Sequence, residues 1–259
     1  MMNTQLGRVV FVIMFAFISV NTCFAQTPRQ YTTNYNGWFV YTGNHKLTDK
    51  WGLHLEMQWR RSNIILDNQQ LLLRGGINYY LHPQVYLTAG YCYALTYPYG
   101  KFAAKCMFPE NRIWEQINFK TSVGAVEVIN RLRLEQRSIN SPVLQEDGAY
   151  TPGDAIYTNR ARALLRFSIP FKGKTIEDRS LYASAFNEVY INFGKNVGYN
   201  IFDQNRAYVG IGYKLPKVGR LELGYLNQLI FRGDGIKVER SHTLQISLSS
   251  NIEFRKKKE

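Results

Sequence analysis

The chain has 259 residues, a formal net charge of +13 at neutral pH and an aromatic content of 14%. After residue 25 no apolar run reaches the roughly 20 residues that a membrane-spanning helix needs, which excludes a helical membrane protein. The basic charge fits anionic lipid head groups or small anions, and an exported chain is not expected to bind nucleic acid.

The first segment, residues 1–25, has the layout of a secretory signal peptide. A basic residue, Arg8, precedes a short apolar run, and small residues then lead to Ala25. This order of charged start, apolar middle and small residue at the cleavage site is typical of export signals. We predict cleavage after Ala25, which leaves a single domain over residues 26–259. Cleavage before Cys23, as in a lipoprotein, and an uncleaved anchor are the alternatives.

The remaining chain alternates apolar and polar residues with a period of two, the pattern of β-strands with two unlike faces. The clearest case is residues 51–60, WGLHLEMQWR, with apolar residues at every odd position and none at the even ones. About eleven such runs of roughly ten residues follow one another. They cover residues 38–47, 51–60, 69–80, 85–97, 111–120, 126–137, 159–169, 181–193, 205–214, 219–230 and 241–254.

The connections between these runs alternate between short turns and longer loops, as in outer-membrane β-barrels. Short turns are expected near residues 48–50, 82–84, 122–124 and 216–218, and a longer segment, 171–179, occupies a short-turn position. Longer loops are expected at residues 62–68, 98–110, 140–157, 194–204 and 232–239. Bacterial barrels normally have an even number of strands, so residues 30–35 are the candidate for one more. We predict an all-β, antiparallel up-and-down transmembrane β-barrel of about 12 strands, with 10 as the fallback.

Strand length and two tryptophans favour lipid over a soluble core as the environment of the apolar face. A tilted strand needs roughly 9–11 residues to cross a bilayer, whereas soluble strands average around 5–6. Trp51 and Trp59 lie on one face, and at about 3.3 Å per residue and a tilt near 40° they are separated by roughly 20 Å of height. We predict that they form an aromatic girdle at the two edges of the apolar band. A soluble two-sheet sandwich is the alternative.

If the apolar face meets lipid, the polar face surrounds a lumen that is rich in charge. Two interpretations are open: an ion-pair network that fills a narrow barrel, or a cationic constriction that selects anions. The predicted lumen charge cluster consists of Arg131, Arg133, Glu135, Arg137, Arg160, Arg162, Arg166 and Glu188.

The sequence predicts no catalytic, cofactor or metal site, and we expect the protein not to be an enzyme. His54 and Glu56 share a face, but the neighbours Ser241 and His242 point to opposite faces of a strand. No GxSxG or HExxH pattern is present. An outer-membrane lipid-active enzyme remains the rival hypothesis.

Three further features have plain structural explanations beside functional ones. Residues 146–154 carry several carboxylates but lack the ligand spacing of an EF-hand, so a solvated loop is expected. The loop aromatics could contact a partner or cover the barrel mouth, which leaves adhesion through the outer loops as a minor hypothesis. Cys92 and Cys106 could form a disulfide in an oxidising compartment, and the sequence leaves this open. The loop aromatics are Tyr97, Tyr99, Phe102 and Phe108.

Five segments carry a resemblance to a known family. They are ENRIWEQ (110–116), NRLRLEQR (130–137), FNEVYINFG (186–194), FDQNRAYVGIGYKL (202–215) and LELGYLNQ (221–228). Together they resemble the family called domain of unknown function 2490, whose members are predicted outer-membrane β-barrels of Bacteroidetes-type bacteria. The resemblance implies a fold and a location but no activity. One departure is the end of the chain, where Phe254 is followed by a basic tail instead of closing the sequence.

The sequence thus predicts a bacterial outer-membrane β-barrel of unestablished activity. Its expected role is structural, or passive transport through a narrow, anion-preferring, arginine-rich lumen. The expected partners are outer-membrane lipid, the barrel assembly machinery and small anionic solutes.

Overall fold

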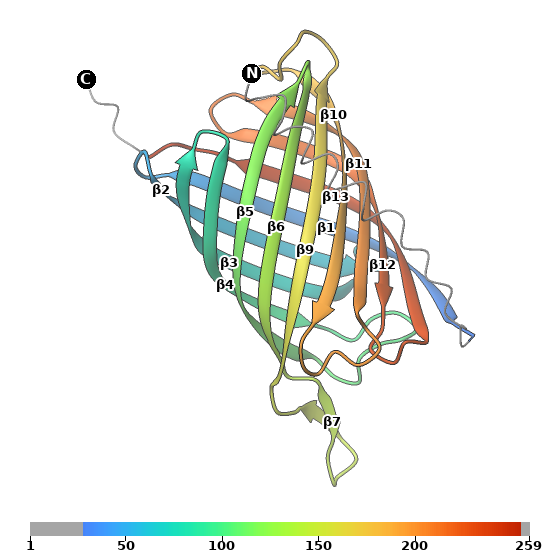
Figure 1. The fold of residues 1–259 in the computed structure, drawn as a ribbon. Coiled ribbons are helices and arrows are strands. Elements are labelled where there is room, and N and C mark those ends of the chain that lie inside the picture. Colours follow the sequence, from blue (N-terminus) through green and yellow to red (C-terminus); the bar gives the residue numbers. More distant parts are fainter. Residues whose placement is uncertain (1–27, 255–259) are drawn as a thin grey trace.

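The computed structural model describes residues 28–254, in which eleven long strands close into one barrel (Figure 1). The predicted signal peptide and its cleavage site lie outside the described residues. No helix within residues 28–254 is long and apolar enough to cross a membrane. The barrel strands are β1 (Gln30–Lys46), β2 (Trp51–Ser62), β3 (Asp67–His82), β4 (Val85–Thr96), β5 (Phe108–Val123), β6 (Val126–Ile139), β9 (Ile156–Pro170), β10 (Leu181–Phe193), β11 (Phe202–Leu215), β12 (Gly219–Phe231) and β13 (Lys237–Ser250).

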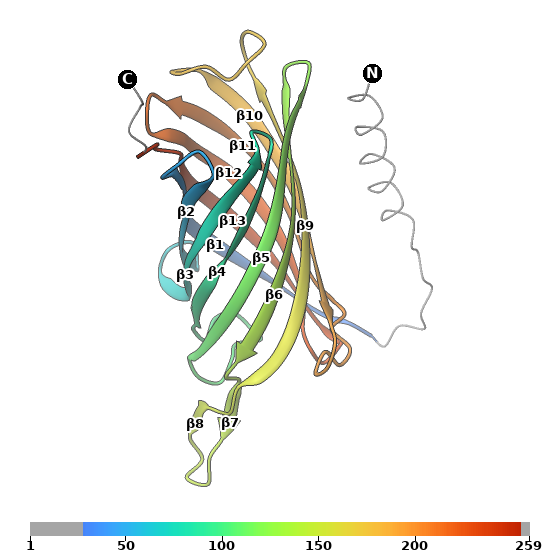
Figure 2. The same ribbon diagram turned by 60° about the vertical axis from the view of Figure 1, so that its left-hand side comes forward.

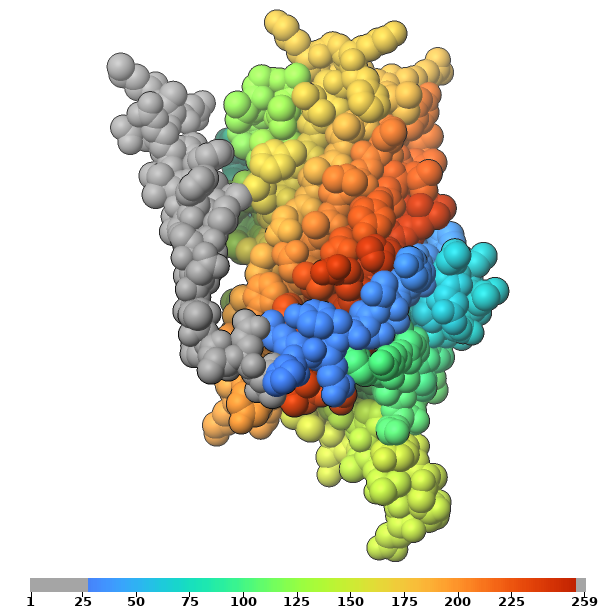
Figure 3. All heavy atoms as spheres, turned by 90° about the vertical axis from the view of Figure 1, so that its right-hand side faces the viewer, coloured from blue at the N-terminus to red at the C-terminus, as the bar shows by residue number. Residues whose placement is uncertain are grey.

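Consecutive barrel strands pair antiparallel around the ring, and the ring closes with a parallel pair. β6 pairs directly with β9, because β7 (Pro142–Leu144) and β8 (Tyr150–Pro152) form a separate hairpin that projects beyond the barrel (Figure 2). β1 runs parallel to β13, and Figure 3 shows the blue β1 lying against the red β13 on the barrel surface. The closed all-β barrel of about twelve strands is confirmed, with eleven strands in residues 28–254 and one parallel seam.

A separate strand at residues 30–35 does not form, because β1 continues through this segment without a turn. An Asn-Gly pair often makes a hairpin turn, but that turn requires positive φ at both residues, and neither Asn36 nor Gly37 has one. Asn36 instead pairs with Thr243 across the seam. A Cβ at position 37 would lie 2.4 Å from the carbonyl oxygen of Ile64, so only glycine lets the β2–β3 loop pack there.

The apolar face of the strands points outward and the polar face points into the barrel. On β2, Leu55 and Met57 are 39% and 46% exposed, whereas Glu56 between them is 7% exposed. On β6, Leu134 is 42% exposed and the adjacent Glu135 is 1% exposed. The alternation read from the sequence therefore separates an apolar exterior from a charged interior, and the alternative two-sheet sandwich is not formed.

The two ends of the barrel differ in their connections (Figure 1). One end, called the turn end here, holds short turns and the segment between β9 and β10. The other, called the loop end, holds longer connections, including the one that carries β7 and β8. Both sets fall where the sequence predicted them. The turn-end connections are residues 47–50, 83–84, 124–125, 171–180 and 216–218, and the loop-end connections are 63–66, 97–107, 140–155, 194–201 and 232–236.

Candidate functional site: the charged barrel interior

Strand register brings the charged residues of the barrel interior side by side. Between β6 and β9, Arg133 lies opposite Arg162 and Glu135 lies opposite Arg160. All four side chains are buried, with exposed fractions below 9%. Because two arginines face each other in this register, neither has a carboxylate directly opposite it.

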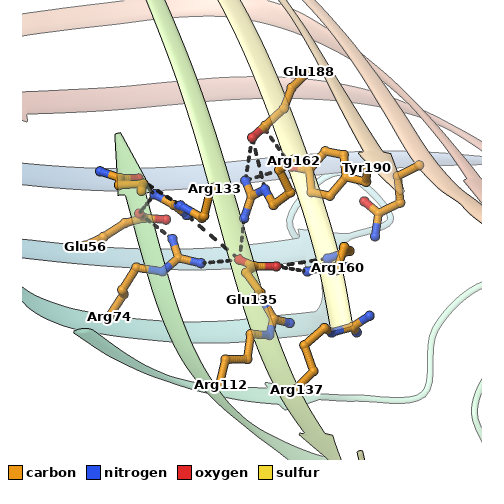
Figure 4. Close-up of polar contacts among 12 residues, drawn as sticks. Glu56, Arg74, Arg112, Arg133, Glu135, Arg137, Arg160, Arg162, Glu188 and Tyr190 are labelled. Carbon is orange, nitrogen blue, oxygen red and sulfur yellow. Dashed lines mark hydrogen bonds and ion pairs between the residues drawn. The ribbon is translucent and has the colours of Figure 1, made fainter. Parts of the chain in front are cut away.

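Glu135 is the centre of this arrangement (Figure 4). One carboxylate oxygen accepts hydrogen bonds from Arg160, at 2.9 Å from Nε and 2.6 Å from Nη2. The other accepts from Arg162 Nη1 at 2.7 Å and from Arg74 Nη2 at 3.3 Å. Three guanidinium groups from β3 and β9 thus converge on one carboxylate of β6.

Glu188 on β10 is a second carboxylate shared by several donors. Its Oε1 accepts from Arg162 Nη2 at 2.8 Å and from Arg131 Nη2 at 2.6 Å. Tyr190 donates its hydroxyl to Oε2 at 2.7 Å. Since Arg162 also reaches Glu135, this one side chain connects the two carboxylates.

Arg133 occupies the least compensated position of the network. Its Nε and Nη2 donate to the amide oxygen of Gln116 at 2.9 and 2.6 Å, and its guanidinium lies 4.7 Å from the ring centroid of Trp114. The carboxylates of Glu56 and Glu135 are each 4.0 Å away, and Nη1 has no hydrogen-bond partner. Cation–π contact and an amide therefore replace a direct ion pair.

The predicted lumen charge cluster is not one cluster. Arg137 lies toward the loop end and pairs with Glu110 at 2.5 Å, whereas Arg166 lies toward the turn end and pairs with Glu222. The other six predicted residues are joined through the two shared carboxylates or lie beside them. These six are Arg131, Arg133, Glu135, Arg160, Arg162 and Glu188.

Three members of the network escaped the sequence-based prediction. Arg74 connects Glu56 to the centre, and Asp203 accepts a 2.7 Å hydrogen bond from Arg160. Glu56 and Arg74 lie on the polar faces of adjacent strands and are direct cross-strand partners. The alternation therefore already placed them inside the barrel, but it could not show which arginines share a carboxylate.

Several ion pairs cross the barrel instead of following its wall. Arg74 of β3 reaches Glu135 of β6, and Arg220 of β12 reaches Glu127 of β6 at 2.7 Å. These two ion pairs therefore join strands that are not neighbours in the barrel. Removing one member would leave its partner charged and buried, which typically costs about 3–5 kcal/mol. These cross-barrel ion pairs therefore narrow the barrel interior.

The predicted aromatic girdle residues lie on the barrel exterior. Trp51 is 50% exposed and its ring centroid lies 4.7 Å from that of Tyr79, near the turn end. Trp59 is 43% exposed and lies 5.3 Å from Phe39, nearer the loop end. Each tryptophan thus stands beside a second aromatic ring of the neighbouring strand.

The residues considered for catalysis and for a disulfide are separated. Ser241 is fully buried in the interior, whereas His242 lies on the exterior, where its Nδ1 is 2.6 Å from the hydroxyl of Tyr225. Among the residues that the structure describes, Cys92 and Cys106 are free. Within residues 28–254 no group of three or more histidine, cysteine or acidic residues could hold a metal ion.

The loop between β4 and β5 folds over the mouth at the loop end. The Tyr99 hydroxyl donates to Glu239 at 3.4 Å, and Arg232 Nη2 donates to the carbonyl oxygen of Phe102 at 3.4 Å. Burial is the main reason that the pKa of Tyr99 is raised. Two of the loop aromatics therefore contact the barrel mouth.

Comparison with known proteins agrees with the resemblance noted in the sequence. A family model described as protein of unknown function (DUF2490) matches residues 35–239. An uncharacterised protein of Methylorubrum extorquens is 27% identical over 199 residues, which cover 74% of this chain and 77% of the relative. No solved structure matches the chain. Because the family model spans most of the barrel, the chain belongs to the DUF2490 family of proteins of unknown function.

Proposed function

We propose that this protein is a bacterial outer-membrane β-barrel that serves as a structural or passive-transport barrel, narrow and anion-preferring. The observation that carries the proposal is the combination of an apolar exterior with an arginine-rich interior crossed by ion pairs. In this proposal the protein is not an enzyme. Bacteroidetes-type outer membranes are the setting that the family resemblance suggests.

The exterior supports placement in a bilayer. Its strands contain 12–17 residues, more than the roughly 9–11 that a tilted crossing requires. Large apolar side chains lie exposed along every wall, such as Ile77 at 59%, Ile113 at 65% and Leu223 at 54%. Soluble monomers rarely expose contiguous apolar patches larger than a few hundred Å². Acyl chains would cover this surface at no cost in unsatisfied polar groups.

The two ends suggest an orientation. Outer-membrane barrels have short periplasmic turns and longer outer loops, so the turn end would face the periplasm. Phe254 lies at this end, where its amide donates to the carbonyl oxygen of Lys46 at 2.9 Å and its ring lies 5.4 Å from that of His45. We propose that this aromatic residue serves the barrel assembly machinery as a terminal signal.

The interior supports narrow passage with a preference for anions. Within residues 28–254, nine strand arginines lie within 4.0 Å of seven strand carboxylates. The paired interior therefore carries net positive charge at neutral pH, and fixed charges of one sign select ions of the other. Because the cross-barrel ion pairs narrow the interior, only small solutes would pass.

Conductance across a planar bilayer tests this function. We expect a small conductance with anion over cation permeability in a salt gradient. Arg162→Gln removes a guanidinium that bridges two interior carboxylates and should reduce the anion preference by at least several-fold. Arg240→Gln is the matched control, because Arg240 is exposed on the exterior of β13, and it should leave the preference unchanged.

Two results would contradict the transport function. A membrane-inserted wild-type barrel without any conductance would favour a structural role. If a deletion strain also had altered lipid A, the lipid-active enzyme would replace the transport proposal.

A further inference from the structure

Two interior arginines lack a carboxylate within ion-pair distance, and both contact the ring of Trp38. Among the described residues, Arg60 and Arg206 take part in no ion pair, although each is only 8% exposed. The guanidinium carbon of Arg60 lies 4.0 Å from the Trp38 ring centroid, and that of Arg206 lies 5.1 Å from it. Two buried cations on one indole ring repel each other unless an anion lies between or beside them.

Neutral side-chain amides accept hydrogen bonds from only some of the N–H donors of these two guanidinium groups. Arg60 donates to Gln58 and to Gln70, at 3.0 and 2.7 Å. Arg206 donates from Nη2 to Gln204 at 3.1 Å, and its Nε is buried without a partner. An unpaired buried donor costs free energy, so the Arg206 Nε marks a place where an acceptor fits.

The barrel wall beside Arg206 contains more polar atoms without partners. Arg206, Gln228 and Ser241 are direct cross-strand partners on β11, β12 and β13. Gln228 Oε1 and Ser241 Oγ are buried and unpartnered. Thr243 Oγ1, two residues along β13 on the same face, is unpartnered as well. Buried polar groups are nearly always hydrogen-bonded, so these neighbouring atoms mark a place where a ligand fits.

Trp38 brings this wall and the two arginines together. Its ring packs against Tyr208 of β11 and Leu226 of β12, so the indole lies over the wall that carries the unpartnered atoms. Asn36, two residues earlier on the same face of β1, has both side-chain amide atoms buried and unpartnered, and it pairs in register with Thr243. These polar groups and the two guanidinium groups therefore lie on β2, β1, β13, β12 and β11, which are consecutive strands of the barrel.

We infer that this part of the barrel interior binds a phosphate-type oxyanion, meaning one that carries negative oxygens and a hydroxyl. The guanidinium groups of Arg60 and Arg206 and the hydroxyls of Ser241 and Thr243 would donate to its oxygens. The unpartnered oxygen of Gln228 requires a donor, which a protonated phosphate supplies and sulfate does not. Charge-assisted bonds to guanidinium groups are the strong ones in such sites. The inference rests on the proposed anion-preferring interior and names its anion.

Anion binding to the purified full-length barrel in a neutral detergent tests the inference without a membrane. Calorimetric titration with inorganic phosphate should show saturable binding, at least about tenfold tighter than binding of sulfate. Arg206→Gln should weaken phosphate binding by roughly tenfold or more, as expected for the loss of a hydrogen bond to a charged group. Arg240→Gln is the matched control, because Arg240 is exposed on the exterior of β13, and it should bind phosphate as the wild type does.

A second variant keeps the test decisive if Arg206→Gln does not fold. Ser241→Ala removes one unpartnered hydroxyl and should weaken phosphate binding several-fold while the barrel remains heat-modifiable in electrophoresis. Absence of saturable phosphate binding, wild-type affinity in both variants, or equal affinity for sulfate would overturn the inference. Phosphate binding without conductance would instead contradict transport and leave the site in place.

Discussion

At the scale of residues, the interior illustrates how buried charges are tolerated when each has more than one partner. Glu135 accepts from three arginines, but each of these has a second acidic partner: Glu56, Asp203 or Glu188. Desolvation of a buried ion costs several kcal/mol, and only good geometry with additional hydrogen bonds offsets it. Sharing of carboxylates provides those bonds. The alternation predicted which residues face inward, whereas the sharing depends on side chains that cross the barrel, which no local pattern contains.

Replacement of the central carboxylate tests the sharing. Glu135→Gln should lower the free energy of unfolding in lipid vesicles by about 3–5 kcal/mol, because several buried guanidinium groups lose part of their compensation. Asp203→Asn should cost less, since within residues 28–254 Asp203 forms an ion pair with Arg160 alone. Urea titration of both variants measures the difference. Equal, small effects would contradict a central role for Glu135.

At the scale of elements, strand positions and turn positions were predictable, but the full extent of the first strand was not. The period of two located all eleven barrel strands, although residues 38–47 cover only the second part of β1, and the loops between them followed. β1 is longer than predicted because nothing turns the chain at Asn36 and Gly37, and the rule of even strand number suggested a turn that the backbone does not make. The parallel seam with β13 depends on which edge strands meet, and that information lies outside any single segment.

The stability of the β12–β13 loop depends on pH through one carboxylate. Asp234 Oδ1 accepts from the amides of Ile236 and Lys237, both at 2.9 Å. These bonds, with the Lys237 ammonium 2.9 Å from Oδ2, lower the pKa of Asp234 to about 2. A depressed pKa stabilises the folded loop above the unfolded value near 4. The stabilisation is lost as the pH falls toward 2.

Carboxyl chemical shifts followed by NMR during an acid titration measure this pKa. We expect the Asp234 midpoint near 2, and we expect Asp234→Asn to remove the pH response of the loop amides. A midpoint near 4 would contradict the bonding described for the loop.

At the scale of the whole molecule, the apolar and charged faces are arranged opposite to those of a soluble ligand barrel. Exposed Leu55, Met57 and Ile77 lie outside, and buried Glu135 and Arg133 lie inside. The sequence contained this separation in its alternation, but alternation alone does not say which face is outside. Strand length and the spacing of the tryptophans predicted that the apolar face lies outside, because both match the dimensions of a barrel that crosses a bilayer. The anion site around Trp38 was not predictable, since its residues come from five strands whose register is set by barrel closure.

The most direct test of the account is the cost of a charge placed on the exterior midway between Trp51 and Trp59. In folding titrations into lipid vesicles, Leu55→Arg should lose roughly 2–4 kcal/mol, as expected for arginine at the bilayer midplane. Ile201→Arg, in an exposed loop at the loop end, is the control and should cost less than about 1 kcal/mol. If Leu55→Arg folded as well as the control, and the barrel stayed soluble without detergent or lipid, the placement of its apolar face in a membrane would be contradicted.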